Sequence, residues 1–178
     1  MDHADHVALI RDGVAGTSGR WLELGAGRGA FTLALADLLG PDAEIVAVDR
    51  NASDLHHLEA AMTDRFPGTR LRTVVGDFSG PVAVGEEPFD GLLAANALHF
   101  VRDPLAVVTR LVPQLRAEAR VIIVEYDSDS GNPWVPHPFS FRSWERIAAT
   151  AGLTATRLVG RVPSRFLGAI YAAASSAP

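Results

Sequence analysis

Residues 20–30, with the sequence RWLELGAGRGA, decide the fold of this chain. An apolar run ends there in a series of alternate glycines, and residues 29–40, GAFTLALADLLG, continue with the composition of a helix. Glycine allows a tight turn and the close approach of a ligand, because it has no Cβ. The N–H groups at the start of a helix are free to bind an anionic group. This stretch therefore predicts a strand, a glycine loop and a helix that together bind a cofactor.

Further apolar segments follow along the chain and alternate with helical patterns. Strands rich in Val, Ile and Leu without polar alternation are buried on both faces, as in parallel sheets. Strand–helix alternation at this spacing predicts βαβ units and a doubly wound α/β sheet. The predicted strands cover residues 20–27, 44–49, 70–78, 89–100 and 120–126, a closing hairpin covers 154–164 and 166–175, and the predicted helices cover 29–40, 51–66, 103–116 and 143–152.

The composition predicts one domain without nucleic-acid or membrane partners. We expect the 178 residues to form a single domain, with a short helix over about residues 2–16 and a core over about 18–175. The net charge of −5 argues against general affinity for nucleic acid or anionic membranes. The acidic, polar start of the chain is unlike a secretory signal. We therefore expect a cytoplasmic protein with a small-molecule partner, either alone or as a homodimer.

Two residue types are missing, and their absence excludes several kinds of chemistry. The chain contains no cysteine, which excludes disulfides, zinc–thiolate sites and cysteine nucleophiles. It also contains no lysine, since all 16 basic residues are arginine. A P-loop needs its lysine to bind phosphates, and Schiff-base enzymes need a lysine amine. Neither of these enzyme classes fits the sequence.

A carboxylate follows the glycine loop at the spacing of a ribose-binding group. Asp49 ends the next predicted strand, roughly 20 residues after the glycines, where an acidic side chain can accept hydrogen bonds from both ribose hydroxyls. Two classes of cofactor fit this geometry. Gly25, Gly27 and Ala30 satisfy the dinucleotide pattern G-x-G-x-x-A. Glu23 beside the turn repels a pyrophosphate and attracts an ammonium group, so it favours a cofactor with a methionine part.

The acidic residue and the glycines resemble the first motif of a known enzyme family. Glu23 and the alternate glycines match the pattern E/D-x-G-x-G-x-G of class I, Rossmann-like S-adenosylmethionine-dependent methyltransferases. Later segments are similar to the remaining motifs of this family in order and spacing, among them VAVDR, GDF and NALH. The last of these resembles the small-molecule methyltransferases, because it lacks the D/N-P-P-Y/F string of enzymes that methylate amino groups of DNA or protein.

The resemblance implies residues that bind S-adenosyl-L-methionine, with S-adenosyl-L-homocysteine as the product. In this family pattern, Asp49 binds the ribose, Asp77 lies at the adenine amino group and Asn96 lies beneath the methionine part. The full set of cofactor-binding residues that the resemblance implies is Glu23, Gly25, Ala26, Gly27, Gly29, Asp49, Arg50, Asp77, Phe78, Asn96 and Ala97.

The resemblance also implies the complete sheet. It implies a mostly parallel, seven-stranded sheet in the order 3-2-1-4-5-7-6, with strand 7 antiparallel and helices on both faces. One departure concerns the Pro-Gly-Gly turn common before the fifth strand, which here reads Arg116-Ala117-Glu118-Ala119-Arg120. A second is Pro113, which lies inside the preceding helix or ends it.

Methyl transfer in this family is an in-line displacement at a sulfonium, for which the cofactor supplies the electrophile. The protein aligns the acceptor, excludes water and, for a hydroxyl or ammonium acceptor, takes a proton. His99 follows the fourth predicted strand and is the candidate general base. Tyr126, Trp134 and His137 follow the fifth strand and are candidates for the acceptor pocket.

Two other functions stay open on the sequence alone. The first is a module that binds S-adenosylmethionine without catalysis, for instance as a subunit of a larger assembly. The second is an NAD-dependent reductase, which the lysine-free chain disfavours because it cannot contain a Tyr-x-x-x-Lys pair. No metal site is predicted, since the DSDSGN segment at residues 127–132 departs from a calcium loop at its glycine and glutamate positions.

Overall fold

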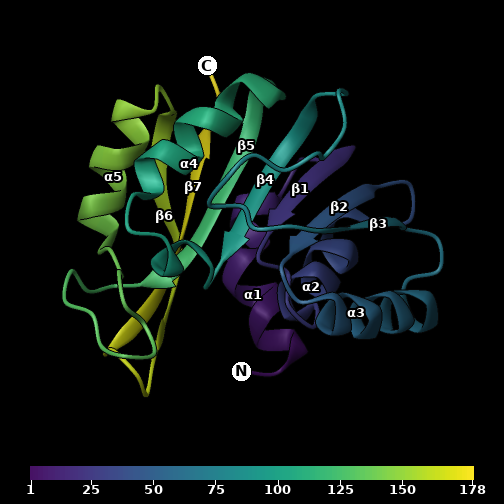
Figure 1. Ribbon diagram of the computed structural model, residues 1–178, viewed down its shortest axis with the longest axis horizontal. Coiled ribbons are helices and arrows are strands. Elements are labelled where there is room, and N and C mark those ends of the chain that lie inside the picture. The colour runs from purple at the N-terminus through teal and green to yellow at the C-terminus, as the bar shows by residue number, and fades with distance from the viewer.

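The computed structural model describes residues 1–178 and contains one seven-stranded sheet (Figure 1). The strand order is β3-β2-β1-β4-β5-β7-β6. Strands β1 to β5 pair in parallel, and β7 runs antiparallel to both β5 and β6. The predicted fold class is therefore confirmed. The strands are β1 (Arg20–Leu24), β2 (Glu44–Asp49), β3 (Arg70–Val75), β4 (Phe89–Ala95), β5 (Leu115–Tyr126), β6 (Thr154–Pro163) and β7 (Ala169–Ser176).

Helices cover both faces of this sheet, and each face has its own hydrophobic core. One cluster of 24 buried residues joins α1, α2 and α3 to the sheet, and a second cluster of 20 joins α4 and α5 to the other face. None of the helices is long and apolar enough to span a bilayer. The helices are α1 (His3–Val14), α2 (Ala30–Leu39), α3 (Ala52–Arg65), α4 (Pro104–Leu111) and α5 (Phe141–Thr150), with short 3-10 turns η1 (Leu98–Phe100) and η2 (Val112–Gln114).

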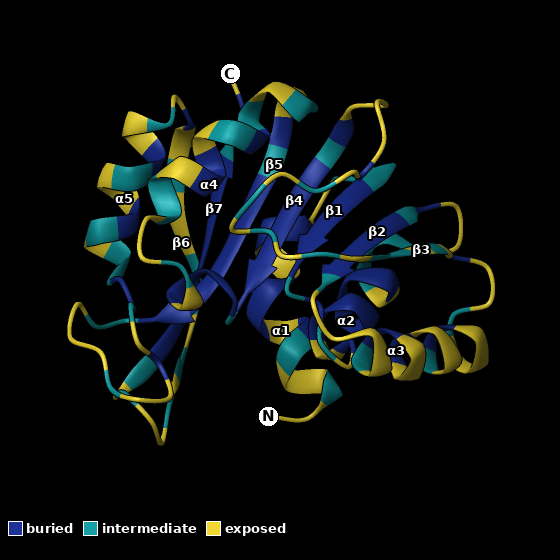
Figure 2. Ribbon diagram, viewed as in Figure 1, coloured by how far each residue is buried: buried dark blue, intermediate teal, exposed yellow.

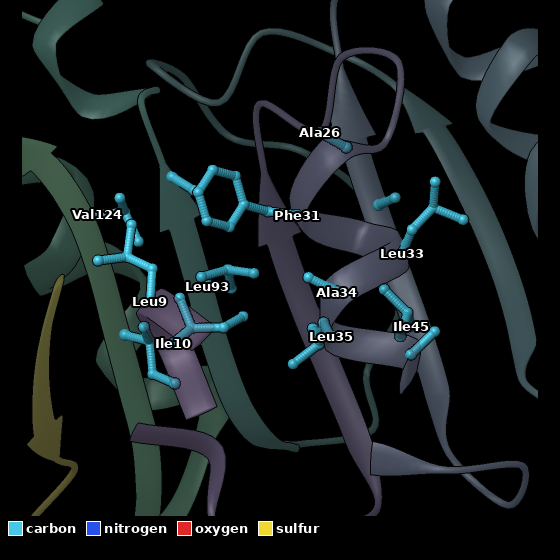
Figure 3. Close-up of a cluster of buried hydrophobic side chains, with 14 of the residues drawn as sticks. Leu9, Ile10, Ala26, Phe31, Leu33, Ala34, Leu35, Ile45, Leu93 and Val124 are labelled. Carbon is cyan, nitrogen blue, oxygen red and sulfur yellow. The ribbon is translucent and has the colours of Figure 1, made fainter. Parts of the chain in front are cut away.

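The central strands are buried along almost their whole length, as expected for a parallel sheet covered on both sides (Figure 2). In the first core, Leu9 and Ile10 of α1 and Phe31 of α2 gather with strand residues such as Leu93 and Val124 (Figure 3). Burial of apolar side chains on this scale fixes the strand positions, because it is the main favourable term in folding.

Three elements differ from the sequence-based expectation. The helix predicted over residues 103–116 ends at Leu111, because Pro113 has no N–H to continue it. The fifth strand begins at Leu115 instead of residue 120, with a register shift against β4. Glu118, in the segment that replaces the family's glycine turn, has a φ of +63°. Strand β3 is only half-buried, because it forms one edge of the sheet.

Loops from most of the sheet meet at the carboxyl edge of the parallel strands. Because β7 is antiparallel, Ile170 at its start pairs with Tyr126 at the end of β5. The turn between β6 and β7 therefore lies at the same edge as the loops that follow β1, β2, β4 and β5 (Figure 1). In open α/β sheets, ligands bind outside the carboxyl ends of the strands.

Candidate active site

The three glycines of the loop after β1 all have positive φ, but they serve different purposes. A Cβ on Gly25 would lie 2.6 Å from the Cβ of Ala97, so this glycine allows two loops of the site to touch. A Cβ on Gly29 would lie 2.4 Å from Leu58, so Gly29 packs the loop against α3. Gly27 faces open space within 4 Å. Of the three, Gly27 leaves the most room for a ligand to approach the backbone.

Helix α2 begins without a side-chain cap, unlike the other four α-helices. Its N-cap is Gly29, which offers no side-chain hydrogen bond, whereas Asp2, Asn51, Asp103 and Ser140 cap the other helices with their side chains. The first N–H groups of α2 therefore have no side-chain acceptor within the chain. Polar groups of a bound cofactor can take that place.

Asp49 ties the glycine loop to the end of β2. Its Oδ2 accepts a hydrogen bond from the Gly27 N–H at 2.8 Å, and its Oδ1 accepts one from the Asn51 N–H at 2.8 Å. A carboxylate has further lone pairs, so both oxygens can still accept from ligand hydroxyls. Asp49 thus fixes the loop and presents a carboxylate at the position expected for a ribose.

Glu23 is a buried carboxyl group without a full set of hydrogen bonds. Its exposed fraction is 2%, and Oε2 has no hydrogen-bond partner. Burial raises the pKa of Glu23 to about 7, and the charge of Asp49 adds to the rise while Thr32 of α2 opposes it. An unpartnered buried carboxylate is costly, and a cationic group nearby lowers that cost. The sequence prediction of an ammonium near Glu23 agrees with this environment.

A cavity of about 310 Å³ lies beside the end of β2 and under the loop after β3. Arg110 of α4 holds this loop in place, since its guanidinium donates to the carbonyl oxygens of Phe78 and Ser79. Hydrogen bonds from Ser79 lower the pKa of Asp77, and the charge of Arg50 acts in the same direction. The cavity is lined by Asp49, Arg50, Asn51, Asp54, Gly76, Asp77, Phe78, Ser79, Phe100 and Val101.

Asn96 turns the chain sharply where β4 ends. Its φ is +51°, a left-handed conformation that asparagine adopts more readily than most residues. Its N–H donates to the Val124 carbonyl at 2.8 Å, and its buried Oδ1 has no partner. The turn brings the following Ala97 against Gly25. Asn96 therefore offers an unpaired amide oxygen next to the glycine loop.

His99 lies in η1 and forms a buried pair with Glu125 of β5. His99 Nδ1 lies 2.9 Å from Glu125 Oε2, and the His99 N–H donates to Glu125 Oε1 at 3.1 Å. The exposed fractions of the two side chains are 4% and 0%. The carboxylate fixes the ring orientation and favours a proton on Nδ1, which leaves Nε2 as the acceptor of a neutral imidazole. Nε2 makes no hydrogen bond within the chain.

Tyr126 and His99 lie in one group of aromatic rings at this edge. The Tyr126 and His99 ring centroids are 5.5 Å apart, and Tyr126 meets Phe166 of the β6–β7 turn edge to face at 6.4 Å. Phe100 lies against the His99 ring at 4.2 Å. Burial raises the pKa of Tyr126, and Glu125 adds to the effect. The structure therefore brings Tyr126 to His99, as the acceptor-pocket hypothesis requires.

Trp134 and His137 are placed differently from Tyr126. Trp134 is 71% exposed in the loop after β5 and makes no ring contact. The His137 N–H donates to the His99 carbonyl at 2.9 Å, while His137 itself lines a separate cavity with Arg102 and Asp129. His137 thus positions the His99 backbone, and Trp134 stands apart from the ring group.

The acidic residues that follow β5 hold loops together. Asp127 pairs with Arg161 of β6 at 2.7 Å and accepts from the Phe141 N–H. Asp129 accepts from the N–H and the hydroxyl of Ser140, the residue that caps α5. Hydrogen bonds from Ser140 and Ser143 lower the pKa of Asp129. These contacts explain the DSDSGN segment as an anchor for the loop and for α5.

Sequence reasoning missed Glu125, Phe100 and Phe166. Glu125 could have been found, because a carboxylate near the end of the buried strand RVIIVEY needs a partner, and His99 follows the neighbouring strand. Phe166 gave no such signal, since its position beside Tyr126 depends on the β6–β7 turn.

A family model described as a methyltransferase domain matches residues 22–118, more than half of the chain. The chain belongs to this methyltransferase family. The glycine loop, Asp49 and the antiparallel β7 agree with its class I members, whose cofactor is S-adenosylmethionine. The dinucleotide alternative is therefore not supported.

Two curated relatives match a part of the methyltransferase chain. A release factor glutamine methyltransferase from Thermosynechococcus vestitus is 29% identical over 111 residues, which cover 62% of this chain and 36% of the relative. A Thermoplasma volcanium protein named as a cobalt-precorrin-6B C(15)-methyltransferase (decarboxylating) is 27% identical over 117 residues, covering 66% and 55%. The chain thus spans about a third to a half of the length of these relatives.

A solved structure shares the fold over the whole chain. The N-terminal domain of EvdMO1, crystallised in the presence of SAH and D-fucose, superposes with a TM-score of 0.72 at 21% identity. The match covers 100% of this methyltransferase chain and 84% of the EvdMO1 domain. At this identity, the likeness supports the fold.

The residues of the site fit the cofactor of the family. Two buried polar atoms without partners, Glu23 Oε2 and Asn96 Oδ1, flank the glycine loop, where an ammonium group can donate to them. Gly27 leaves open space, and the cavity beside Asp49 has room for a nucleoside. Glu23, Gly27, Asp49, Asp77 and Asn96 would therefore hold S-adenosylmethionine.

Proposed function

We propose that this methyltransferase transfers the methyl group of S-adenosylmethionine to a hydroxyl group of a small-molecule acceptor, with His99 as the general base. The buried pair of His99 and Glu125 carries the proposal. It places an imidazole of defined orientation at the carboxyl edge, two residues after Ala97, which touches the glycine loop. A base oriented by a carboxylate is the arrangement that proton abstraction requires.

Each residue has a separate task in this proposal. The bound cofactor supplies an electrophilic methyl group on a sulfonium, which becomes a neutral thioether as the new bond to the acceptor oxygen forms. His99 Nε2 takes the hydroxyl proton, and Glu125 holds the imidazolium that results. Asp49 and Glu23 bind the cofactor, and the buried setting of His99 helps to exclude water.

The test separates proton abstraction from cofactor binding. Purified protein is incubated with methyl-labelled S-adenosylmethionine and a mixed panel of phenols, aliphatic alcohols and amines. His99→Gln is expected to lower kcat by about 10²–10⁴-fold, the usual contribution of general acid–base catalysis. Cofactor binding, measured by the rise in Tm with S-adenosylhomocysteine, is expected to stay unchanged. His56→Gln is the matched control, since His56 lies on the exposed side of α3 with a side chain 85% exposed.

Glu125→Gln tests the positioning role of the carboxylate. It is expected to lower kcat less than His99→Gln does and to change the pH–rate profile, with little effect on KM. An equal fall of activity and cofactor affinity in the His99 variant contradicts the proposal. Cofactor binding without transfer to any class of acceptor favours the alternative of a binding module.

The organisation of the whole protein is also part of the proposal. We infer that residues 1–178 form one methyltransferase domain, because every strand from β1 to β7 belongs to one sheet. A cytoplasmic location and a homodimer are predictions from the sequence. Cell fractionation checks the first, and sedimentation at several concentrations checks the second.

A further inference from the structure

A continuous row of aromatic rings crosses the carboxyl edge of the sheet. Its members come from three separate segments: Phe100 and His99 from η1, Tyr126 from the end of β5, and Phe166 from the turn between β6 and β7. Successive ring centroids are 4.2, 5.5 and 6.4 Å apart. These spacings lie in the range of favourable aromatic contacts, so the rings form one surface. We call these four residues the aromatic row.

The row begins at the cofactor cavity. Phe100 lines that cavity together with Asp49 and Asp77. The next ring is His99, the proposed base. An acceptor must lie beside both the cofactor and the base, and the aromatic row is the surface that connects these two places and extends beyond them.

The outer members of the row are apolar and exposed. Phe100 is 57% exposed and Phe166 is 61% exposed, although both are large hydrophobic side chains. Exposed aromatic rings at a site are typical of surfaces that bind ligands. Asp127 and Arg161, which lie next to the row in sequence or across the sheet, form an ion pair with each other at 2.7 Å. The row therefore offers ring faces and edges, with few groups that would select a charged ligand.

We propose that the aromatic row binds a planar, uncharged aromatic acceptor and presents its hydroxyl group to His99 Nε2. This inference rests on the proposed function and narrows its acceptor to hydroxyarenes. A planar ring can lie against Phe166 and Tyr126 and bury their exposed apolar surface. A sugar or another polyhydroxylated acceptor needs many hydrogen-bonding partners, and the row supplies two side-chain polar groups, the Tyr126 hydroxyl and His99 Nε2.

The experiment compares acceptors that differ in planarity and charge. The probes are 2-naphthol, its saturated analogue decahydro-2-naphthol, and cyclohexylamine. For each probe, methyl transfer is measured with labelled S-adenosylmethionine, and direct binding to the protein loaded with S-adenosylhomocysteine is measured by saturation-transfer NMR. We expect 2-naphthol to bind and to be methylated at least tenfold more efficiently than the other two probes, on the order of one aromatic contact.

Variants of Phe166 locate the effect on the row. Phe166→Ala is expected to raise KM and Kd for 2-naphthol about tenfold and Phe166→Leu a few-fold, with kcat changed less than twofold. Leu158→Ala is the matched control, because Leu158 is an exposed apolar residue of β6 outside the row. Cofactor affinity is expected to be the same in all three variants, which also shows that each variant folds.

The outcomes separate this inference from the proposed function. Binding of 2-naphthol that depends on Phe166, without transfer to any probe, supports the row and contradicts the proposed function. Transfer to decahydro-2-naphthol or cyclohexylamine with equal efficiency overturns the row and leaves methyl transfer standing. Loss of 2-naphthol binding in Leu158→Ala to the same extent as in Phe166→Ala also overturns the row.

Discussion

At the β1–β2 side of the carboxyl edge, the groups that face the cofactor come from two short segments, residues 23–29 and 49–51. Much of their work is done by the backbone: positive φ values, uncapped N–H groups and one carboxylate that binds two N–H groups. At the β4–β7 side, the site is built from side chains that lie far apart in the sequence, such as His99, Glu125 and Phe166. The first side depends on local conformation, and the second depends on packing between distant elements.

The largest effect is expected on the side built from side chains. Glu125→Ala removes one partner of the buried pair with His99, which typically costs about 3–5 kcal/mol of the free energy of unfolding. Glu125→Gln keeps an oxygen that accepts from the His99 N–H, so its loss is smaller. Urea denaturation of both variants measures the difference. Similar losses for Ala and Gln show that the pair adds nothing beyond packing volume.

A smaller effect of the same order is expected from the one buried acidic side chain on the cofactor side. The folded-state pKa of Glu23 is about 7, above the unfolded value of 4.5, so the folded protein binds the extra proton between these values. The stability contribution is complete below pH 4.5 and is lost as the pH rises to 7. A shift of this size corresponds to about 3 kcal/mol. Glu23→Gln removes this loss, as urea denaturation at pH 4.5 and 7.5 measures.

Cofactor binding has the opposite dependence on pH. If the ionised form of Glu23 attracts the ammonium group, the apparent affinity for S-adenosylhomocysteine rises by about tenfold between pH 6 and 8, because the competent fraction grows accordingly. Calorimetric titration at the two pH values measures it, and Glu23→Gln is expected to show a flat profile. An equal slope in that variant assigns the proton to another group.

The glycine loop provides a test of the backbone side alone. Gly25→Ala places a Cβ 2.6 Å from Ala97 at a φ of +69° and is expected to cost about 2–3 kcal/mol of stability. Gly27→Ala meets open space at a φ of +53°, so its stability cost is about 1 kcal/mol. Its main effect is expected on cofactor affinity, measured as the loss of the ligand-induced rise in Tm. Equal stability losses would contradict the different purposes assigned to these glycines.

The smallest effect is expected away from the site. Glu118 has a φ of +63°, which costs a residue with a Cβ about 1–2 kcal/mol. Glycine removes this strain and loses part of the gain to chain entropy, so Glu118→Gly is expected to raise stability by about 0.5 kcal/mol. Ala117→Gly, the neighbouring control without positive φ, is expected to lower it by about 0.5–1 kcal/mol.

The same comparison explains what the sequence predicts and what it does not. The strands, the sheet order and the glycine loop follow from local patterns, since residues 20–30 contain the strand, the turn and the helix start together. Asp49 lies where the spacing predicts it. The pair of His99 with Glu125 depends on the β4–β5 register, and the contact of Tyr126 with Phe166 depends on the β6–β7 turn. Trp134 is equally close to β5 in sequence and lies apart, because loop geometry decides such positions.

The reversed direction of β7 has a consequence for how this enzyme can diversify. A strand that ran parallel would begin at the opposite edge, and the segment before it would lie far from the reaction. Because β7 is antiparallel, residues 164–168 form a hairpin tip that reaches the carboxyl edge while its two strands occupy the outer end of the sheet. Hairpin tips tolerate insertions well, since few contacts hold them. Grafting tips of other lengths and sequences there would alter acceptor choice with the glycine loop untouched, so selectivity and cofactor use can evolve as independent modules.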